Sequence, residues 1–276
     1  MNQSSRRLPA ALALSLLALS PLYLAAADWP AYRHDSARSG VTTEQLPSPL
    51  HLQWTHAAKP PRPAWPEPGR ELNKLAFDYA YDTVVANGLL YFGSSADYQV
   101  HCLDLNTGQQ RWSFVTEGPV RFAPVVEDGR LFVASDDGYL YCLSAADGKL
   151  LWKFYGGPKP DRVMGNEQLV SRWLLRSGVS VDTGVVYLSA GMWPTEGVYL
   201  YALRANDGSV VWKQESVGAE YRKQPHPGSF SMIGLAPQGY LVADADRLFV
   251  PTGRNAAAAY DRNTGKESYY HSAPYT

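Results

Sequence analysis

The sequence predicts an all-β protein, a β-propeller built from four-stranded antiparallel blades. A tight corner recurs four times, and each copy ends in an aromatic residue: Trp112, Trp152, Trp212 and Tyr269. The corner glycines lie about 40 to 60 residues apart, which is the period of a four-stranded unit. One sheet of this size cannot bury both of its faces alone, so the blades are expected to stack radially.

The interval that ends at Trp152 shows the repeat unit most plainly. Four short runs rich in Val, Leu, Phe and Tyr are expected to be strands: residues 123–126, 130–134, 139–143 and 149–154. Asp-Gly pairs separate them, and the glycine of such a pair tolerates the positive φ of a hairpin turn. The same first hairpin returns around Asn87-Gly88, Thr183-Gly184 and Ala245-Asp246. The sequence therefore predicts four blades.

The corner also carries a family resemblance. Its form, a Thr or Asp followed by Gly and, four residues on, Trp, resembles the tryptophan-docking motif of pyrroloquinoline-quinone (PQQ)-like propeller repeats. These repeats occur in quinoprotein alcohol dehydrogenases and in the non-enzymatic outer-membrane-assembly propeller. The resemblance covers about residues 82 to 270. It implies that Trp112, Trp152 and Trp212 each lie flat on the glycine corner of an adjacent blade, while Tyr269 departs from the motif.

The first 27 residues predict a secretory signal. Arg6 and Arg7 precede an apolar run over residues 8–24, and three alanines stand before Asp28. This order is typical of a signal peptide cleaved after Ala27, and the apolar run is short for a membrane span. The mature chain is expected to be periplasmic or secreted. A net charge of −1 with 18% charged residues indicates no nucleic-acid partner.

Residues 28–69 form a different kind of segment before the repeats of residues 70–276. Residues 28–40 resemble the opening segment of many exported members of this repeat family. Residues 50–54 are expected to form an isolated outer strand with its own docking residue, Trp54, as the fourth strand of the last blade. The proline-rich residues 59–68 are expected to run extended from this closing strand to the first blade.

The number of corners bears on the completeness of the ring. Rings of this family usually have seven or eight blades, whereas this chain supplies four corners and one closing strand. We therefore expect an incomplete ring, the amino-terminal fragment of a longer protein, which missing C-terminal blades or a second copy would close. The alternative is a small closed ring of four or five blades.

The two cysteines are expected to be free. An exported protein with two cysteines would ordinarily form one disulfide. Cys102 and Cys142, however, occupy the same third-strand position in successive blades. Equivalent atoms of packed sheets lie roughly 10 Å apart, beyond the ~7 Å limit for the Cα atoms of a bridge. Buried thiols are therefore favoured over the disulfide.

Binding residues are expected on one end of the blades. The connections between blades and those between second and third strands emerge on the same face, and the longer repeat intervals place insertions there. Long loops with arginine and aromatic side chains on a rigid face usually carry binding function. The candidate ligand face comprises Arg162, Asn166, Arg172, Trp173, Trp193, Arg222 and Arg254. The alternative is that these insertions only cap the channel, and Asp136 and Asp137 are expected to serve turn geometry.

Signals for catalysis are weak. The six histidines show no metal-binding spacing, the acidic residues show no spacing typical of a calcium cluster, and a haem attachment motif is lacking. No catalytic residue and no metal ligand is predicted. The favoured function is an exported non-catalytic propeller, a binding platform for a protein, a glycan or a small molecule. The alternative is the N-terminal half of a PQQ-dependent (quinoprotein) alcohol or sugar dehydrogenase, for which the resemblance implies PQQ with calcium.

Overall fold

The computed structural model describes residues 27–65, 79–165, 167–215, 217–219, 221–223, 228–232, 234–252 and 255–270. These residues form strands and turns, with a single-turn 3-10 helix at Pro194–Glu196. Within the described ranges, no helix is long and apolar enough to cross a membrane. The expected signal peptide lies outside the described residues, apart from Ala27.

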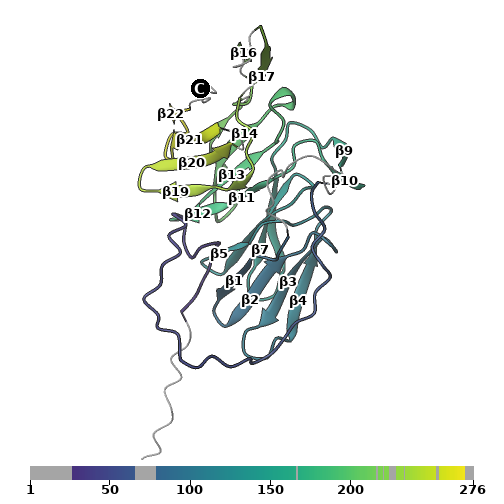
Figure 1. The fold of residues 1–276 in the computed structure, drawn as a ribbon, viewed down its shortest axis with the longest axis vertical. Helices are drawn as coiled ribbons and strands as arrows, with labels where there is room; N and C mark the ends of the chain where they lie inside the picture. Colours follow the sequence, from purple (N-terminus) through teal and green to yellow (C-terminus); the bar gives the residue numbers. More distant parts are fainter. Residues whose placement is uncertain are drawn as a thin grey trace, which may run out of the picture.

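Four antiparallel sheets follow one another along the chain, each with its strands in sequence order (Figure 1). Blade one contains β1 (Thr83–Ala86), β2 (Leu89–Gly93), β3 (Gln99–Asp104) and β4 (Gln110–Val115). Blade two contains β5 (Val125–Glu127), β6 (Arg130–Ala134), β7 (Tyr139–Ser144) and β8 (Leu150–Tyr155). Blade three contains β12 (Ser180–Asp182), β13 (Val185–Ala190), β14 (Tyr199–Arg204) and β15 (Val210–Gln214). Blade four contains β19 (Val242–Asp244), β20 (Arg247–Thr252), β21 (Asn255–Asp261) and β22 (Glu267–Tyr269). The predicted all-β architecture of four-stranded blades is confirmed.

The first strands of the blades lie innermost. Strand β5 contacts both β1 and β12, and β12 contacts β19. The blades therefore fan out from a common side, as in a propeller. In the part of the chain that the structure describes, the four blades do not close into a ring (Figure 1).

The hydrophobic core lies between neighbouring blades rather than within one. Leu131 and Val133 of β6 pack with residues of blade one, whereas Phe132, between them, packs with residues of blade three. This alternation follows from the two-residue period of a strand, which sends successive side chains to opposite faces. Each blade therefore depends on its neighbours to bury both faces.

The opening segment lies across the inner strands. The backbone of Trp29 exchanges two hydrogen bonds with Val85 of β1, and the carbonyl of Pro30 accepts one from the amide of Val126. The buried guanidinium of Arg38 donates to the carbonyls of Leu241 and Val179, near blades three and four. Burial lowers the pKa of Arg38 to about 10. Residues 28–40 therefore connect blades that are distant in sequence.

Short strands occupy the two longest connections. The hairpin of β9 (Arg162–Gly165) and β10 (Gln168–Ser171) precedes blade three, and that of β16 (Tyr221–Lys223) and β17 (Phe230–Met232) precedes blade four (Figure 1). Strand β11 (Ser177–Gly178) pairs in parallel with β18 (Gly239–Tyr240), and these two strands contact β13 and β20, respectively. The insertions expected between these blades are therefore partly ordered as strands.

Residues 50–54 differ from their predicted structure. They were expected to form an outer strand, but the described backbone from residue 50 to 63 contains no strand. A strand needs a partner for its backbone hydrogen bonds. Among the described residues, no strand pairs with residues 50–54. The indole of Trp54 nevertheless reaches blade one.

Candidate functional site

Four tryptophans meet the glycine corner of the blade that follows them. The indole N–H groups donate to the carbonyl three residues before each glycine, with Trp54 bound to Leu105, Trp112 to Ala145, Trp152 to Ala205 and Trp212 to Arg262 at 2.8 to 3.2 Å. A Cβ on any of the four glycines, Gly108, Gly148, Gly208 or Gly265, would lie 2.5 to 2.8 Å from the nearest ring atom. Tyr269, on β22, is 50% exposed. The same contact therefore recurs at every described corner.

A buried ion cluster lies at the opposite end of the blades, where the connections between blades emerge. The Nε of Arg121 lies 2.7 Å from Oδ2 of Asp136, and Nη2 of Arg176 lies 3.1 Å from the same oxygen. All three side chains are at most 3% exposed. Burial raises the pKa of the Asp136 carboxyl, but the charges of Arg176 and Arg121 outweigh burial and hold this pKa below its ordinary value. The carboxylate therefore stays ionised between two guanidinium groups.

Arg121 also anchors two segments that cover the cluster. Its Nη1 donates to the carbonyl of Arg62 at 2.6 Å, and its Nη2 donates to Oε1 of Gln168 at 3.1 Å. Arg62 belongs to the proline-rich segment, and its amide donates to Oγ of Ser95. Gln168 opens β10. The proline-rich segment and the β9–β10 hairpin are thereby fixed on the same side of the blades.

Trp65 covers the other guanidinium of the cluster. The Arg176 guanidinium carbon lies 5.3 Å from the centre of the Trp65 ring, within cation–π distance. Trp193 meets Trp65 edge to face, with ring centres 5.8 Å apart. Trp65 also packs against a small cluster that includes Met192. The indole nitrogen of Trp65 and Nε2 of Gln168 are buried and have no hydrogen-bond partner among the described residues.

The residues of the candidate ligand face lie in different surroundings. Arg162 pairs with Glu117, and Arg172 pairs with Glu196 at 2.8 Å. Trp173 is buried and donates its indole N–H to the carbonyl of Glu196, so its ring is held in the interior. Trp193 is 48% exposed. The backbone of Arg222 lies in β16, whereas Asn166 and Arg254 lie outside the described residues.

Sequence reasoning did not identify the buried cluster. The sequence predicts a turn role for Asp136, but its carboxylate pairs with two arginines. Asp137 does serve the turn, because its carboxylate accepts a hydrogen bond from the amide of Tyr139. The sequence does carry a signal for buried charge, because Arg121 stands between Val120 and Phe122, and Arg176 follows Leu175. Charged residues inside apolar runs are rarely buried unless paired. Within the described residues, no group of three or more His, Cys, Asp or Glu is arranged to hold a metal ion.

Comparison with known proteins identifies related chains. The family model described as outer membrane protein assembly factor BamB matches residues 51–172 and 196–273. The chain is 28% identical over 174 residues to the quinohemoprotein alcohol dehydrogenase ADH-IIG of Pseudomonas putida, which covers 60% of this chain and 22% of that protein. It is 25% identical over 228 residues to BamB of Moranella endobia, which covers 69% of this chain and 53% of that protein. The chain thus spans about half or less of these relatives.

Solved structures show the same fold. The quinohemoprotein alcohol dehydrogenase from Comamonas testosteroni superposes with a TM-score of 0.63 and 20% identity, over 90% of this chain and 41% of that chain. A europium-containing methanol dehydrogenase superposes with a TM-score of 0.61 and 15% identity, over 90% of this chain and 49% of that chain. At these identities the likeness establishes the propeller fold alone.

Proposed function

Because the chain belongs to the propeller-repeat family described as outer membrane protein assembly factor BamB, we propose that it is an exported, non-catalytic propeller that binds a protein partner. The proposed binding surface, here called the loop face, comprises the β9–β10 hairpin and the residues around Trp193. The main support for this proposal is the pair of exposed apolar side chains on the outer side of the hairpin. Met164 is 74% exposed and stands directly opposite Leu169, which is 49% exposed.

The composition of the loop face supports a protein partner. Trp193 adds an exposed ring, and Arg162 and Arg172 place charged side chains close by. Met, Trp and Arg are enriched in protein interfaces, and exposed apolar patches with a polar rim often mark such surfaces. The hairpin is also held rigidly, because Gln168 on its inner side binds Arg121. A rigid apolar surface loses little conformational entropy when a partner binds.

The buried ion cluster does not fit PQQ, the cofactor that the dehydrogenase relatives suggest. A planar cofactor with carboxylates needs cationic donors and a flat aromatic surface that face open space. Arg121 and Arg176 instead direct their donors to Asp136 and its neighbours. The ring of Trp65 already covers Arg176.

The N-terminal part of a quinoprotein alcohol or sugar dehydrogenase is a second candidate. Its support is the sequence similarity to the Pseudomonas putida enzyme, which is named as a quinohemoprotein alcohol dehydrogenase. In such a protein, residues outside this chain would have to complete the cofactor site with calcium. For both candidates we propose a periplasmic or secreted location, which rests on residues 1–27 of the sequence.

Crosslinking can test the proposed platform. A photoreactive amino acid at Leu169 should crosslink in the cell envelope to a component of outer-membrane assembly, whereas the same group at Leu150, an exposed residue of the outer strand β8, should not. Leu169→Asp should abolish the partner's binding, with Leu150→Asp as the matched control. Equal crosslinking from both positions would contradict a specific loop face.

A cofactor experiment separates the two candidates. We expect calorimetry with PQQ and Ca²⁺ to show no binding to the chain, and a dye-linked assay to show no alcohol oxidation. PQQ binding that is lost in Trp193→Ala or Arg172→Ala would favour the dehydrogenase candidate instead.

A further inference from the structure

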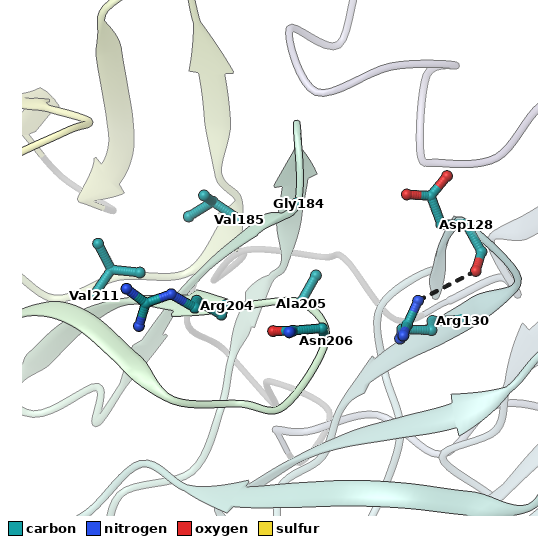
Figure 2. Close-up of a pocket in the computed structure, with 8 residues that line it drawn as sticks. All are labelled: Asp128, Arg130, Gly184, Val185, Arg204, Ala205, Asn206 and Val211. Carbon is teal, nitrogen blue, oxygen red and sulfur yellow. Dashed lines mark hydrogen bonds between the residues drawn. The ribbon is translucent and has the colours of Figure 1, made fainter.

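A groove lies between blades two and three at the end of the blades opposite the loop face. Its volume is about 460 Å³. The lining residues come from hairpin turns and strand ends of the two blades (Figure 2): Asp128, Arg130, Gly184, Val185, Arg204, Ala205, Asn206 and Val211. The antiparallel order of each blade places these turns away from the connections between blades. The groove is therefore separate from the loop face.

The two arginines of this groove differ from most others in the molecule. Among arginines whose side chains the structure describes, most pair with a carboxylate, and Arg38 donates to four backbone carbonyls. Within the same described set, only Arg33, Arg130 and Arg204 have neither arrangement. Two of these three line one groove. Among the described residues, neither Arg130 nor Arg204 is therefore held in an ion pair with a carboxylate.

The bonds that Arg130 and Arg204 do make are weak or neutral. Arg130 donates to the carbonyl of Asp128 at 3.4 Å, and its buried Nε has no hydrogen-bond partner among the described residues. Arg204 donates to the hydroxyl of Ser209 at 3.2 Å. Both bonds are weaker than the charge-assisted hydrogen bonds that a guanidinium group makes to a carboxylate.

Comparison between blades shows that Arg204 is not required by the corner. The equivalent residues Asp104 and Asp261 each accept hydrogen bonds from two backbone amides of their own corner. An arginine side chain cannot accept such bonds. Blade three therefore gives up part of the turn stabilisation found in blades one and four, and places a positive charge at the groove instead.

The arrangement of the side chains suits an extended ligand. Figure 2 shows Arg204 beside Val211 at one end of the groove, Arg130 at the other, and Asn206 between them. The Asp128 carboxylate points away from Arg130 in the same view. Two further acids among the described residues lie near the groove: Glu127, whose carboxylate accepts from the amide of Gly184, and Asp207, which follows Asn206 and interacts electrostatically with Arg204 without an ion-pair contact. The two positive ends are thus joined by a polar centre and apolar walls.

We propose that this groove binds an extended acidic segment of a protein partner, with one acidic side chain on Arg130 and a second on Arg204. Guanidinium groups bind carboxylates through strong charge-assisted hydrogen bonds. The Asn206 amide can both donate and accept, which matches a peptide unit. Val185 and Val211 offer apolar contact that an inorganic anion cannot use. This site goes beyond the proposed loop-face function and does not depend on it.

Fluorescence anisotropy can test the groove. The probe is a labelled peptide with two glutamates separated by a short serine spacer, and the control peptide carries glutamine at both positions. The full chain should bind the glutamate peptide and should not bind the glutamine peptide. R130Q and R204Q should each weaken binding by about tenfold or more. R247Q, at the blade-four equivalent of Arg130, should bind as the unchanged protein does.

Specific outcomes would overturn the proposal. These are equal binding of the two peptides, an equal loss in R247Q, displacement of the peptide by low concentrations of inorganic phosphate, or dimerisation of the chain through this groove. Arg204 is exposed, so R204Q tests the site even where R130Q fails to fold. L169D on the loop face should leave peptide binding unchanged, which separates this site from the proposed platform.

Discussion

The indole ring of Trp152 in blade two rests on Gly208 in the corner of blade three. A Cβ at residue 208 would lie 2.8 Å from Cε3 of the ring, and the indole N–H donates to the carbonyl of Ala205 at 3.2 Å. A real Cβ cannot approach a ring this closely without displacing it. The corner therefore needs glycine for two reasons, the ring contact and a φ of +73°.

Gly208→Ala should destabilise the protein more than Gly184→Ala. Both glycines have positive φ, but Gly184 has open space where a Cβ would stand. The positive φ should cost about 1 kcal/mol in both variants, and displacement of Trp152 should add about 1 to 3 kcal/mol in Gly208→Ala. Urea titration measures both free energies of unfolding. Equal losses would show that the ring contact contributes little.

Trp152→Ala should cost about 3 to 5 kcal/mol, as large-to-small changes at packed positions do. Tyr269→Ala should cost clearly less, because Tyr269 is half exposed on the last described strand. The measurement is the midpoint and slope of denaturant unfolding for the two variants. Equal losses would count against a stabilising role of the tryptophan contacts between blades.

Asp136→Asn should destabilise the protein by about 3 to 5 kcal/mol at neutral pH, since it leaves two buried guanidinium groups without a counter-charge. Asp147, an exposed residue whose hydrogen bond to Lys149 lowers its pKa to about 2, supplies the control Asp147→Asn. The control should change the unfolding free energy little at that pH. A loss in Asp147→Asn as large as that in Asp136→Asn would contradict the special role of the buried cluster.

The same cluster predicts a pH dependence. The folded pKa of Asp136 lies below its unfolded value of about 3.9, so its contribution is present above that value and lost as pH falls through the folded pKa. Stability of the unchanged protein should therefore fall below about pH 4, and Asp136→Asn should lose less over this range. Thermal melts at a series of pH values make the comparison.

The two thiols should be inert in the folded protein. Cys102 and Cys142 are free and buried opposite Trp112 and Trp152, and burial raises the pKa of each thiol to about 12. Few thiolates then exist at neutral pH, and reagents do not reach them. A thiol reagent without reductant should react with both cysteines only after unfolding. An absence of reactive thiols in the unfolded chain would indicate a disulfide.

Local sequence accounts for most of the fold. The first hairpin turn of blade two is an example, because Asp128 and Gly129 both have positive φ, as their Asp-Gly sequence predicts. The tryptophans could be assigned to corners for a similar reason, since the motif repeats at a fixed place within each blade. Turn geometry and strand alternation depend on residues a few positions apart, so one sequence carries their signal.

The pairing within the ion cluster and the composition of the groove could not be predicted from local sequence. Asp136 has the sequence of a turn residue, and only the packing of blade two against its following connection brings Arg176 to it. Arg130 and Arg204 lie in different blades and become neighbours of one groove only when those blades stack. The sequence by itself therefore determined the blades and their corners, because these follow from local backbone and hydrophobic periodicity. The tertiary structure alone decided which charges pair with one another and which lack an ion-pair partner, because that depends on residues brought together across blades.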